Sequence, residues 1–499
     1  MEENKRASYR SIMKGTAIFG GVQVFNILIN VIRGKFVACL LGPEGMGISA
    51  LFVSTTNIIT QFTGFGLQLG SIKDISQAYE RHDKHTLSRI AKIFQHLMLL
   101  TGSIAGLISL LGASWLSSFT FGTEEYSWGF AGLSIMLFFS SISTAETTIL
   151  QGTRQLKSLA KSSMFGAVGG LLIGVPLYYF FGTGGIVPAM VVAAIIVYII
   201  NRSYCNKLNL DNPKLTFKEV IYEGRNMMSL GVIMMISTLI GAIVLYLINV
   251  FIKRYGNAAD VGLYQAASSI SNQYIGLVFS AMAVDYLPRL AAISTDNVKV
   301  REIVTNQLEI VMLVVTPLVI GIIVTAPLVV RLLLTHEFLP IVELLRLMGI
   351  GLFLKAFIYP IGYIAFSKGD KKVFFWMDGV FSNQITLLLS LLGYCFYGLN
   401  GLGIAFIIAN ILCIIVLMSV VYWRYSFCLS YKLIPMLGGL GSFVVLAYIC
   451  FELFGESVFS YILGVIILII VCVYSLVMLD KMLYIREWVT LKYMRKDDE

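Results

Sequence analysis

The sequence predicts an all-α protein that crosses a membrane many times, with about fourteen transmembrane helices. Apolar residues make up 57% of the 499 residues and charged residues only 13%, and the mean hydropathy is +0.82. An average soluble protein carries about 25% charged residues. Apolar runs of about 20 residues, the length that a membrane-spanning helix needs, recur along the chain. These observations exclude a soluble enzyme, a disulfide scaffold and a disordered chain.

The expected spans follow one another with short connections. We expect them to begin near residues 13, 46, 90, 127, 159, 184, 227, 261, 304, 341, 373, 400, 432 and 458. The first span follows a basic stretch, but its apolar run is too long for a signal peptide, so we expect it to be retained. No linker rich in Pro, Ser or Gly divides the chain, which leaves no room for a catalytic domain outside the membrane. The seven cysteines form no C-x-x-C pair, and we interpret them as small apolar residues.

The Lys and Arg residues support this arrangement. If the N-terminus is cytoplasmic, 30 of the 37 fall in cytoplasmic segments, where membrane proteins concentrate them. The net charge of +9 is therefore explained by the basic residues of the cytoplasmic segments and does not indicate a nucleic-acid partner. The remaining seven are Arg33, Lys35, Lys253, Arg254, Arg331, Arg346 and Lys355.

Two stretches of the chain resemble each other and predict an internal repeat. Residues 28–31 and 247–250 both read L-I-N-V, and each stretch is followed by basic residues, a glycine-containing turn and a helix with several Ser and Asn residues. Internal repeats are the usual plan of secondary transporters. We therefore expect two pseudo-repeated six-helix lobes and a further helix pair with a basic cytoplasmic tail, at residues 1–205, 226–428 and 429–499.

Polar side chains line one face of each of the first two spans. Since unpaired polar groups in hydrocarbon are costly, these faces must contact other helices or a wet cavity. Arg33 favours the cavity, because a cation inside an apolar run needs an anion or water. The candidate cavity-lining residues are Gln23, Asn26, Asn30, Asn57 and Gln61, together with Asn272 in the second copy of the repeat.

The tenth span contains three charged residues. Glu343 and Arg346 are three positions apart and are expected to pair. Lys355 lies near the middle of the span, and no acidic residue lies within four positions of it. A lysine at the centre of a membrane costs about 2.5–3.5 kcal/mol on insertion scales. We interpret Lys355 as functional, with an ion pair to another helix as the alternative.

Three carboxylates lie inside or at the edge of spans. Glu146 and Asp285 are candidates for coupling to H⁺ or Na⁺, whereas Asp378 near a cytoplasmic end needs no special role. The sequence has no G-x-x-x-x-G-K-[ST] loop for ATP and no H-E-x-x-H metal site. We therefore expect no cofactor and no metal, and neither a primary pump nor a metallopeptidase.

Four stretches of the sequence together carry a family resemblance. They are G-K-F-V-A-C-L-L-G-P-E-G-M-G at 34–47, T-G-F-G-L at 63–67, D-V-G-L-Y-Q-A-A-S-S-I-S at 260–271 with Y-L-P-R-L at 286–290, and F-L-K-A-F-I-Y-P-I-G-Y at 353–363. These stretches resemble the O-antigen and enterobacterial-common-antigen flippases of the Wzx type. Such flippases belong to the multidrug/oligosaccharidyl-lipid/polysaccharide exporter superfamily, and the similarity extends from about residue 10 to about residue 425.

The resemblance implies two six-helix lobes arranged as a V around a cationic cavity. It also implies alternating access and export of an undecaprenyl-diphosphate-linked oligosaccharide across the bacterial inner membrane. Lys35 and Lys355 match basic positions of the family, and Arg33 falls where related lipid II flippases place an arginine. The last helix pair, which many close relatives lack, departs from the pattern. Besides the lipid-linked substrate and membrane lipid, the candidate partners are H⁺ or Na⁺ and the polysaccharide polymerase machinery.

Two other functions compete with this one. A cation-coupled multidrug exporter of the same superfamily would need an acidic cavity for organic cations, whereas Arg33, Lys35 and Lys355 suit a diphosphate. A membrane glycan polymerase or ligase would need a large periplasmic loop, and the longest outside loop expected here is about 15 residues.

Both termini are predicted to lie in the cytoplasm, because the charge partition and the even number of spans both require it. Alkaline phosphatase fused to the C-terminus should be inactive, and green fluorescent protein at the same place should fluoresce. A C-terminal phosphatase that is active in the periplasm would contradict the topology.

Overall fold

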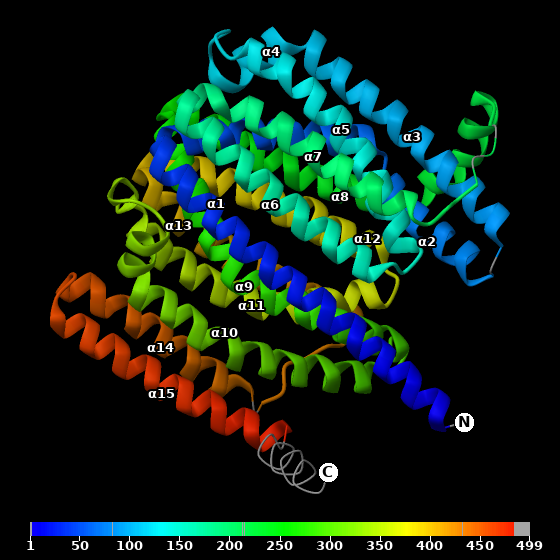
Figure 1. Cartoon of the computed structure of the whole chain (residues 1–499). Coiled ribbons are helices and arrows are strands. Elements are labelled where there is room, and N and C mark those ends of the chain that lie inside the picture. Colours follow the sequence, from blue (N-terminus) through cyan, green and yellow to red (C-terminus); the bar gives the residue numbers. More distant parts are fainter. Residues whose placement is uncertain (1, 82, 212, 214, 432, 484–499) are drawn as a thin grey trace, which may run out of the picture. The chain divides into compact units, whose positions relative to one another are not determined.

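The computed structural model describes residues 2–81, 83–211, 213, 215–431 and 433–483, and this part of the chain is all-α (Figure 1). The side chains of Gln23 and Asp285, both candidates from the sequence, lie outside the described residues. The predicted all-α membrane architecture is confirmed. The chain divides into two compact units: the first extends to Gly262 and includes Leu333–Thr335, and the second comprises the rest.

The first unit consists of eight α-helices and the beginning of a ninth. They are α1 (Glu2–Gly64), α2 (Leu67–Glu80), α3 (Lys84–Leu111), α4 (Ala113–Phe121), α5 (Ser127–Gly152), α6 (Leu156–Phe181), α7 (Ile186–Asn206), α8 (Phe217–Tyr255) and the start of α9 (Ala258–Ala292). A 3₁₀ turn, η1 (Gly182–Gly185), joins α6 to α7. Because α8 packs with this unit, the unit ends later than the predicted lobe of residues 1–205, and the two-lobe division stays a prediction.

The second unit contains the remaining helices. They are the rest of α9, α10 (Asn297–Leu333), the 3₁₀ turn η2 (His336–Phe338), α11 (Ile341–Ser367), α12 (Lys371–Phe374), the π-helical segment η3 (Phe375–Phe381), α13 (Ser382–Tyr425), α14 (Leu433–Phe454) and α15 (Val458–Leu483). The segments α12, η3 and α13 form one continuous helical stretch with a π-helical part near its start.

Two of the helices contain sharp glycine turns. Gly42 in α1 has φ 64° and ψ −170°, and Gly398 in α13 has φ 57° and ψ −138°. Residues with a side chain rarely adopt such positive φ angles. Pro43 directly follows the first turn and suits the start of a new helical segment. Each of these two helices therefore provides two crossing segments, as the expected turns after the first and eleventh spans require.

The observed helices are compatible with the predicted fourteen spans. Nine stretches of the described chain are long and apolar enough to cross a membrane. Three of them, Val24–Gly64, Leu156–Asn206 and Lys371–Tyr425, are 41 to 55 residues long and contain two crossing segments each. At 35 and 27 residues, α9 and α11 are also long enough to span the apolar layer.

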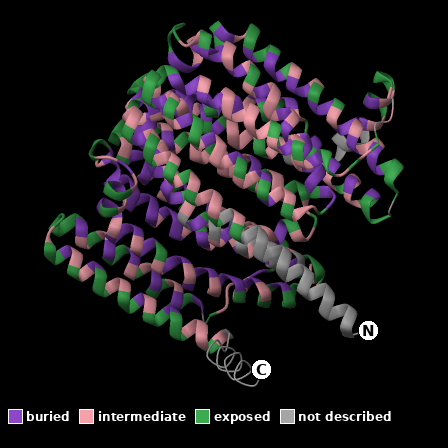
Figure 2. Cartoon of the chain, viewed as in Figure 1, coloured by how far each residue is buried: buried purple, intermediate pink, exposed green. Residues whose placement is uncertain are grey.

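The last helix pair shows which face packs against protein and which suits lipid. The buried residues of α14 recur every three or four positions and form one stripe: Leu433, Met436, Leu440, Val444, Ala447 and Phe451. Its exposed face is also apolar, as at Val445 and Ile449. Buried and exposed residues alternate in the same way along α14 and α15, which run side by side (Figures 1 and 2). An apolar exposed face is what a helix in contact with lipid requires.

A charged cluster fixes this pair to α11. The predicted pair of Glu343 and Arg346 is confirmed, with 3.8 Å between the carboxylate and the guanidinium. Arg346 is only 5% exposed and also faces Glu456, which lies between α14 and α15, at 3.7 Å. Its guanidinium lies 4.3 Å from the centre of the Phe451 ring, and Tyr448 donates a 2.7 Å hydrogen bond to Glu343. The buried arginine is therefore compensated by two carboxylates and an aromatic ring.

In the first unit, α8 is held by polar contacts at both ends. Near its start, Arg89 of α3 bonds Glu223 at 2.7 Å. Towards its other end, the hydroxyl groups of Tyr246 and Thr120 lie 2.7 Å apart. At the turn into α9, the chain crosses the segment of α1 that follows Gly42 with almost no space between the backbones. A Cβ atom on Gly47 would lie 1.8 Å from the Ala258 carbonyl oxygen, and one on Gly262 would lie 1.9 Å from that of Pro43.

This crossing predicts that Gly47→Ala destabilises the protein. The added methyl group meets backbone atoms that cannot move aside, and overpacking of this kind costs about 1–3 kcal/mol. Gly34→Ala is the matched control, because nothing lies within 4 Å of its Cβ position. Replacing a helix-interior glycine should stabilise by about 0.5–1 kcal/mol. Thermal unfolding of the purified protein should give a lower Tm for Gly47→Ala only, and equal Tm values would contradict the close crossing.

Candidate functional site

The cations predicted to bind substrate lie in both units. In the first unit, Arg33 and Lys35 lie on α1 before the Gly42 turn. Arg33 is half-buried and donates a 3.4 Å hydrogen bond to the hydroxyl group of Tyr178 on α6, whereas Lys35 is exposed. In the second unit, Lys355 lies in the middle of α11, and it is exposed although its neighbours Phe353 and Ala356 are buried. Each of these positions is accessible from outside the packed core.

The polar stripe of α1 contacts neighbouring helices at some positions and is exposed at others. Asn26 donates a 2.8 Å hydrogen bond to Ser163 of α6, and Gln61 accepts one of 3.3 Å from Thr238 of α8. Asn30 and Asn57 are exposed. Asn272, in the second unit, is exposed as well. The stripe therefore combines the two expected roles, contact between helices and lining of an open surface.

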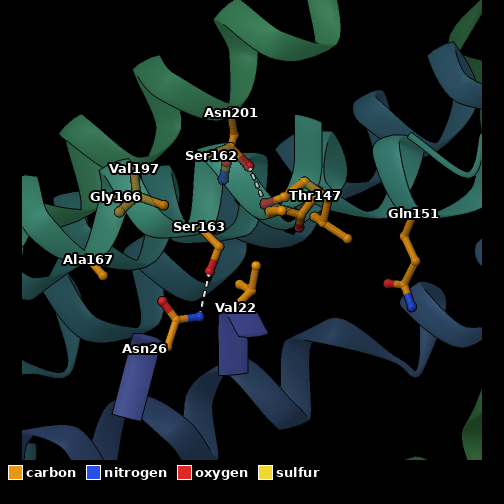
Figure 3. Close-up of a pocket in the computed structure, with 12 residues that line it drawn as sticks. Val22, Asn26, Thr147, Gln151, Ser162, Ser163, Gly166, Ala167, Val197 and Asn201 are labelled. Atoms are coloured by element: carbon orange, nitrogen blue, oxygen red, sulfur yellow. Dashed lines mark hydrogen bonds between the residues drawn. The ribbon is translucent and has the colours of Figure 1, made fainter. Parts of the chain in front are cut away.

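A polar pocket of about 430 Å³ lies beside this stripe, between α1, α5, α6 and α7 (Figure 3). Its polar lining consists of amides and hydroxyl groups without a charge: Asn26, Thr147, Gln151, Ser162, Ser163 and Asn201. Asn201 points towards α5 and donates a 2.7 Å hydrogen bond to Ser143. The buried Oδ1 atom of Asn26 has no hydrogen-bond partner among the described atoms, so it can accept a hydrogen bond from a bound group.

Sequence reasoning found only one wall of this pocket. Asn26 belongs to the predicted stripe, whereas no pattern in the sequence indicates Ser162, Ser163 or Asn201. Isolated hydroxyl and amide residues in apolar helices are common, and their convergence depends on how α6 and α7 pack. A polar residue every three or four positions on one helix is the signal that a sequence can show.

Glu146 is buried in the first unit and is paired. Its side chain is 1% exposed and accepts a 2.8 Å bond from Arg202 of α7 and a 3.2 Å hydrogen bond from Gln95 of α3. These contacts connect α5 to two neighbouring helices. The ion-coupling role of Glu146 stays a prediction.

A second cavity, of about 320 Å³, surrounds Lys355 in the second unit. Its wall is formed by α11, α12, the π-helical segment and α13. Asp378 of the π-helical segment lines the same cavity and is the charged group that acts electrostatically on Lys355. The sequence predicts an interfacial carboxylate at Asp378, near the cytoplasmic end of a span, and its position 23 residues from Lys355 gives no sign that the two share a cavity. The alternative role of Lys355, an ion pair to another helix, stays a prediction.

Several other polar groups around this cavity form hydrogen bonds within the protein. Tyr359 donates a 2.8 Å hydrogen bond to the carbonyl of Phe279, and Tyr363 donates one of 3.3 Å to Tyr359. The Asn410 amide donates a 2.7 Å hydrogen bond to the carbonyl of Phe406. These groups shape the wall, and the lysine and the aspartate contribute its charge.

The loop between α11 and α12 is fixed by Asp370, outside the membrane-spanning segments. Arg424 and Tyr425, at the end of α13, donate hydrogen bonds of 2.6 Å and 3.0 Å to its carboxylate. Desolvation disfavours the charged form, but the hydrogen bonds from Arg424, Val373 and Tyr425 outweigh it and hold the pKa of Asp370 below its ordinary value. This clamp holds the end of α13 to the start of α12, and therefore supports the wall that carries Asp378.

The sequence of the chain is similar to that of known proteins. A family model described as "Polysaccharide biosynthesis protein" matches residues 36–343. The lipid III flippases of Escherichia coli (strain K12) and Shigella flexneri are each 23% identical to the chain over 391 residues, which cover 76% of this chain and 90% of each relative.

The fold is similar to that of solved membrane transporters. The lipid II flippase MurJ, in an inward closed conformation, aligns with a TM-score of 0.70 at 14% identity and covers 95% of this chain and 100% of its own. An inward-facing multidrug resistance MATE family transporter of the MOP superfamily aligns with a TM-score of 0.64 at 18% identity, covering 80% and 94%. At these identities the similarity establishes the fold.

Exposure along α1 predicts the reactivity of introduced cysteines. In a background with the native cysteines replaced by alanine, Asn30→Cys and Asn57→Cys should react with a water-soluble maleimide, because the polar stripe faces water. The controls are Leu51→Cys and Ile59→Cys, at buried positions of the same helix. Equal labelling at all four positions would show that the stripe does not face water.

Proposed function

Because the chain belongs to the polysaccharide biosynthesis protein family, we propose that it is a flippase for a lipid-linked precursor of a surface polysaccharide. The substrate is an undecaprenyl-diphosphate-linked oligosaccharide, of the O-antigen or a related type, which moves across the bacterial cytoplasmic membrane by alternating access. Two lipid III flippases that align over 90% of their length support this proposal. The resemblance to exporters of the multidrug/oligosaccharidyl-lipid/polysaccharide superfamily is confirmed.

The accessible cation in the middle of α11 is the observation that carries the proposal. A diphosphate headgroup has about two negative charges, and moving it through a 30 Å apolar layer without partners costs far more than a few kcal/mol. A cation in a wet cavity offsets this cost. Lys355 meets the requirement in the second unit, and we assign the same role to Arg33 and Lys35 in the first.

The lipid tail and the sugars of the substrate need weaker interactions with the protein than the diphosphate does. The tail can stay in lipid throughout the transfer. The uncharged amides and hydroxyl groups of the pocket beside Asn26 suit the hydroxyl groups of a sugar, and the buried Oδ1 atom of Asn26 supplies an acceptor. We therefore expect charge to contribute more than shape to substrate binding.

A multidrug exporter of the same superfamily is the second candidate, because the chain also has the fold of a MATE family transporter. Such an exporter would bind organic cations and would need an acidic cavity. The half-buried Arg33 and the exposed Lys35 and Lys355 favour an anionic substrate instead. A glycan polymerase or ligase is the third candidate, but the relatives named above are flippases and a transporter. We propose cytoplasmic termini, coupling to H⁺ or Na⁺ and association with the polysaccharide polymerase machinery as further features of the flippase.

Replacing Lys355 or Arg33 by alanine should reduce export of the glycan by about tenfold or more, since each change removes a charge-assisted contact to the diphosphate. Lys355→Arg should retain part of the activity. The measurement is the amount of surface glycan, with the abundance of the membrane protein determined in parallel. Lys299→Ala, on the exposed start of α10, is the control. If Lys355→Ala exports normally at normal abundance, the cation at the centre of α11 has another role.

A further inference from the structure

The cavity around Lys355 contains a carboxylate whose role the proposed function does not explain. Among the described residues that line this cavity, Lys355 and Asp378 are the charged ones. Each acts electrostatically on the other. Both are exposed, so the pair lies at an accessible wall of the cavity and not in the packed core. A negative charge at a site for an anionic headgroup would weaken binding unless it has a function of its own.

The local structure places Asp378 at this wall in an unusual way. It lies within the π-helical segment Phe375–Phe381, which is seven residues long and interrupts the helical stretch between α12 and α13. π-helical turns are rare and are frequent at functional sites. A π-helical turn contains one residue more than an α-helical turn. It therefore changes which side chains of the following helix face the cavity. The neighbour Gly379 is buried, so the segment packs closely at the position next to the carboxylate.

Electrostatics explains what the pair does when no substrate is present. An ammonium group in the middle of an apolar helix is unfavourable without a counter-charge. Asp378 supplies that charge within the same unit, and the empty cavity is then close to neutral. When an anion enters, it competes with Asp378 for the same ammonium group.

We propose that Asp378 competes with the diphosphate for the ammonium group of Lys355. Asp378 interacts with the lysine when no substrate is bound, and the diphosphate replaces it on binding. When the headgroup leaves, Asp378 interacts with the lysine again. This role deepens the proposed function and rests on it. A carrier must release its substrate as well as bind it, and a counter-charge that remains in the protein weakens the bound state. Asp378 is therefore a residue that sets affinity through Lys355 and needs no contact with the substrate.

The contrast with Arg346 on the same helix supports this assignment. Arg346 is buried, has two carboxylates within 4 Å and stacks on an aromatic ring. Arg346 is also only 5% exposed, so its charge is not accessible to a ligand. Lys355 is exposed, and Asp378 is its one acidic partner within the described cavity lining. A single counter-charge at an accessible wall can be exchanged for another anion.

The test is binding of inorganic pyrophosphate and of undecaprenyl diphosphate to the full chain reconstituted in lipid nanodiscs. Asp378→Asn should bind both probes about tenfold more tightly than the original protein, a change typical of coupling between interacting sites. The same variant should export less glycan, because release is slower. Lys355→Ala should bind both probes weakly. The double variant Lys355→Ala with Asp378→Asn should equal Lys355→Ala, since the effect of Asp378 acts through the lysine.

Three further variants test whether the change in affinity depends on the charge of Asp378. Asp378→Glu keeps the charge and should bind the probes with nearly the original affinity. Glu309→Gln removes a half-buried carboxylate from α10 in the same unit and should leave affinity unchanged. Asp378→Ser gives the same expectation as Asp378→Asn, and it is measured in parallel in case the amide side chain disturbs the π-helical segment.

The outcomes separate this inference from the proposed function. If Lys355→Ala loses binding while both neutral Asp378 variants bind pyrophosphate with unchanged or weaker affinity, Asp378 is not a competitor and the flippase proposal stands. If tightening persists in the double variant, Asp378 acts without the lysine, which also overturns the inference. If Lys355→Ala binds both probes as tightly as the original protein, the assignment of Lys355 in the proposed function fails first.

Discussion

An ionised side chain in the hydrocarbon layer needs an opposite charge or water, and this constraint determines where the charges of this chain lie. The described residues satisfy it with pairs that join neighbouring helices or parts of one unit. Glu146 forms an ion pair with Arg202, and Arg346 faces Glu343 and Glu456, whereas Lys355 and Asp378 are opposite charges that line one cavity. Two of these pairs have a buried member and connect helices, whereas the third lies at the wall of a cavity. The same rule therefore accounts for the structural contacts and for the charges of the proposed binding site.

The backbone obeys the corresponding rule for its own polar groups. Within the apolar layer each N–H and C=O group needs a partner inside its segment, so the chain is helical and changes direction only in short turns. Gly42 and Gly398 make such turns within one or two residues by adopting positive φ angles. Gly47 and Gly262 then allow two helices to cross at backbone distance. The positions of Arg33 and Lys35 before the first turn depend on this geometry.

Much of the architecture could be predicted because the length of a span is set by the thickness of the bilayer. Spans expected near residues 127, 341 and 458 correspond to α5, α11 and α15, which begin at those residues. The pair of Glu343 and Arg346 could also be predicted, because residues three apart share a helix face. The partner of Lys355 could not be identified. Asp378 is on another helix, and its orientation depends on a π-helical segment that no periodic pattern in the sequence reveals.

The difference between a structural charge and a functional one then follows from how completely the protein compensates it. Arg346 is buried and would have to leave two carboxylates without their partner in order to bind a ligand, which is unfavourable. Lys355 and Asp378 are both exposed, so in the proposed exchange the lysine passes from the carboxylate to another anion without burying either charge unpaired. The state in which Lys355 interacts with Asp378 and the state in which it binds a diphosphate can therefore have similar free energies. The proposed flippase needs this similarity to bind a headgroup on one side of the membrane and release it on the other. A stronger cationic site would bind the diphosphate more tightly and transport it more slowly.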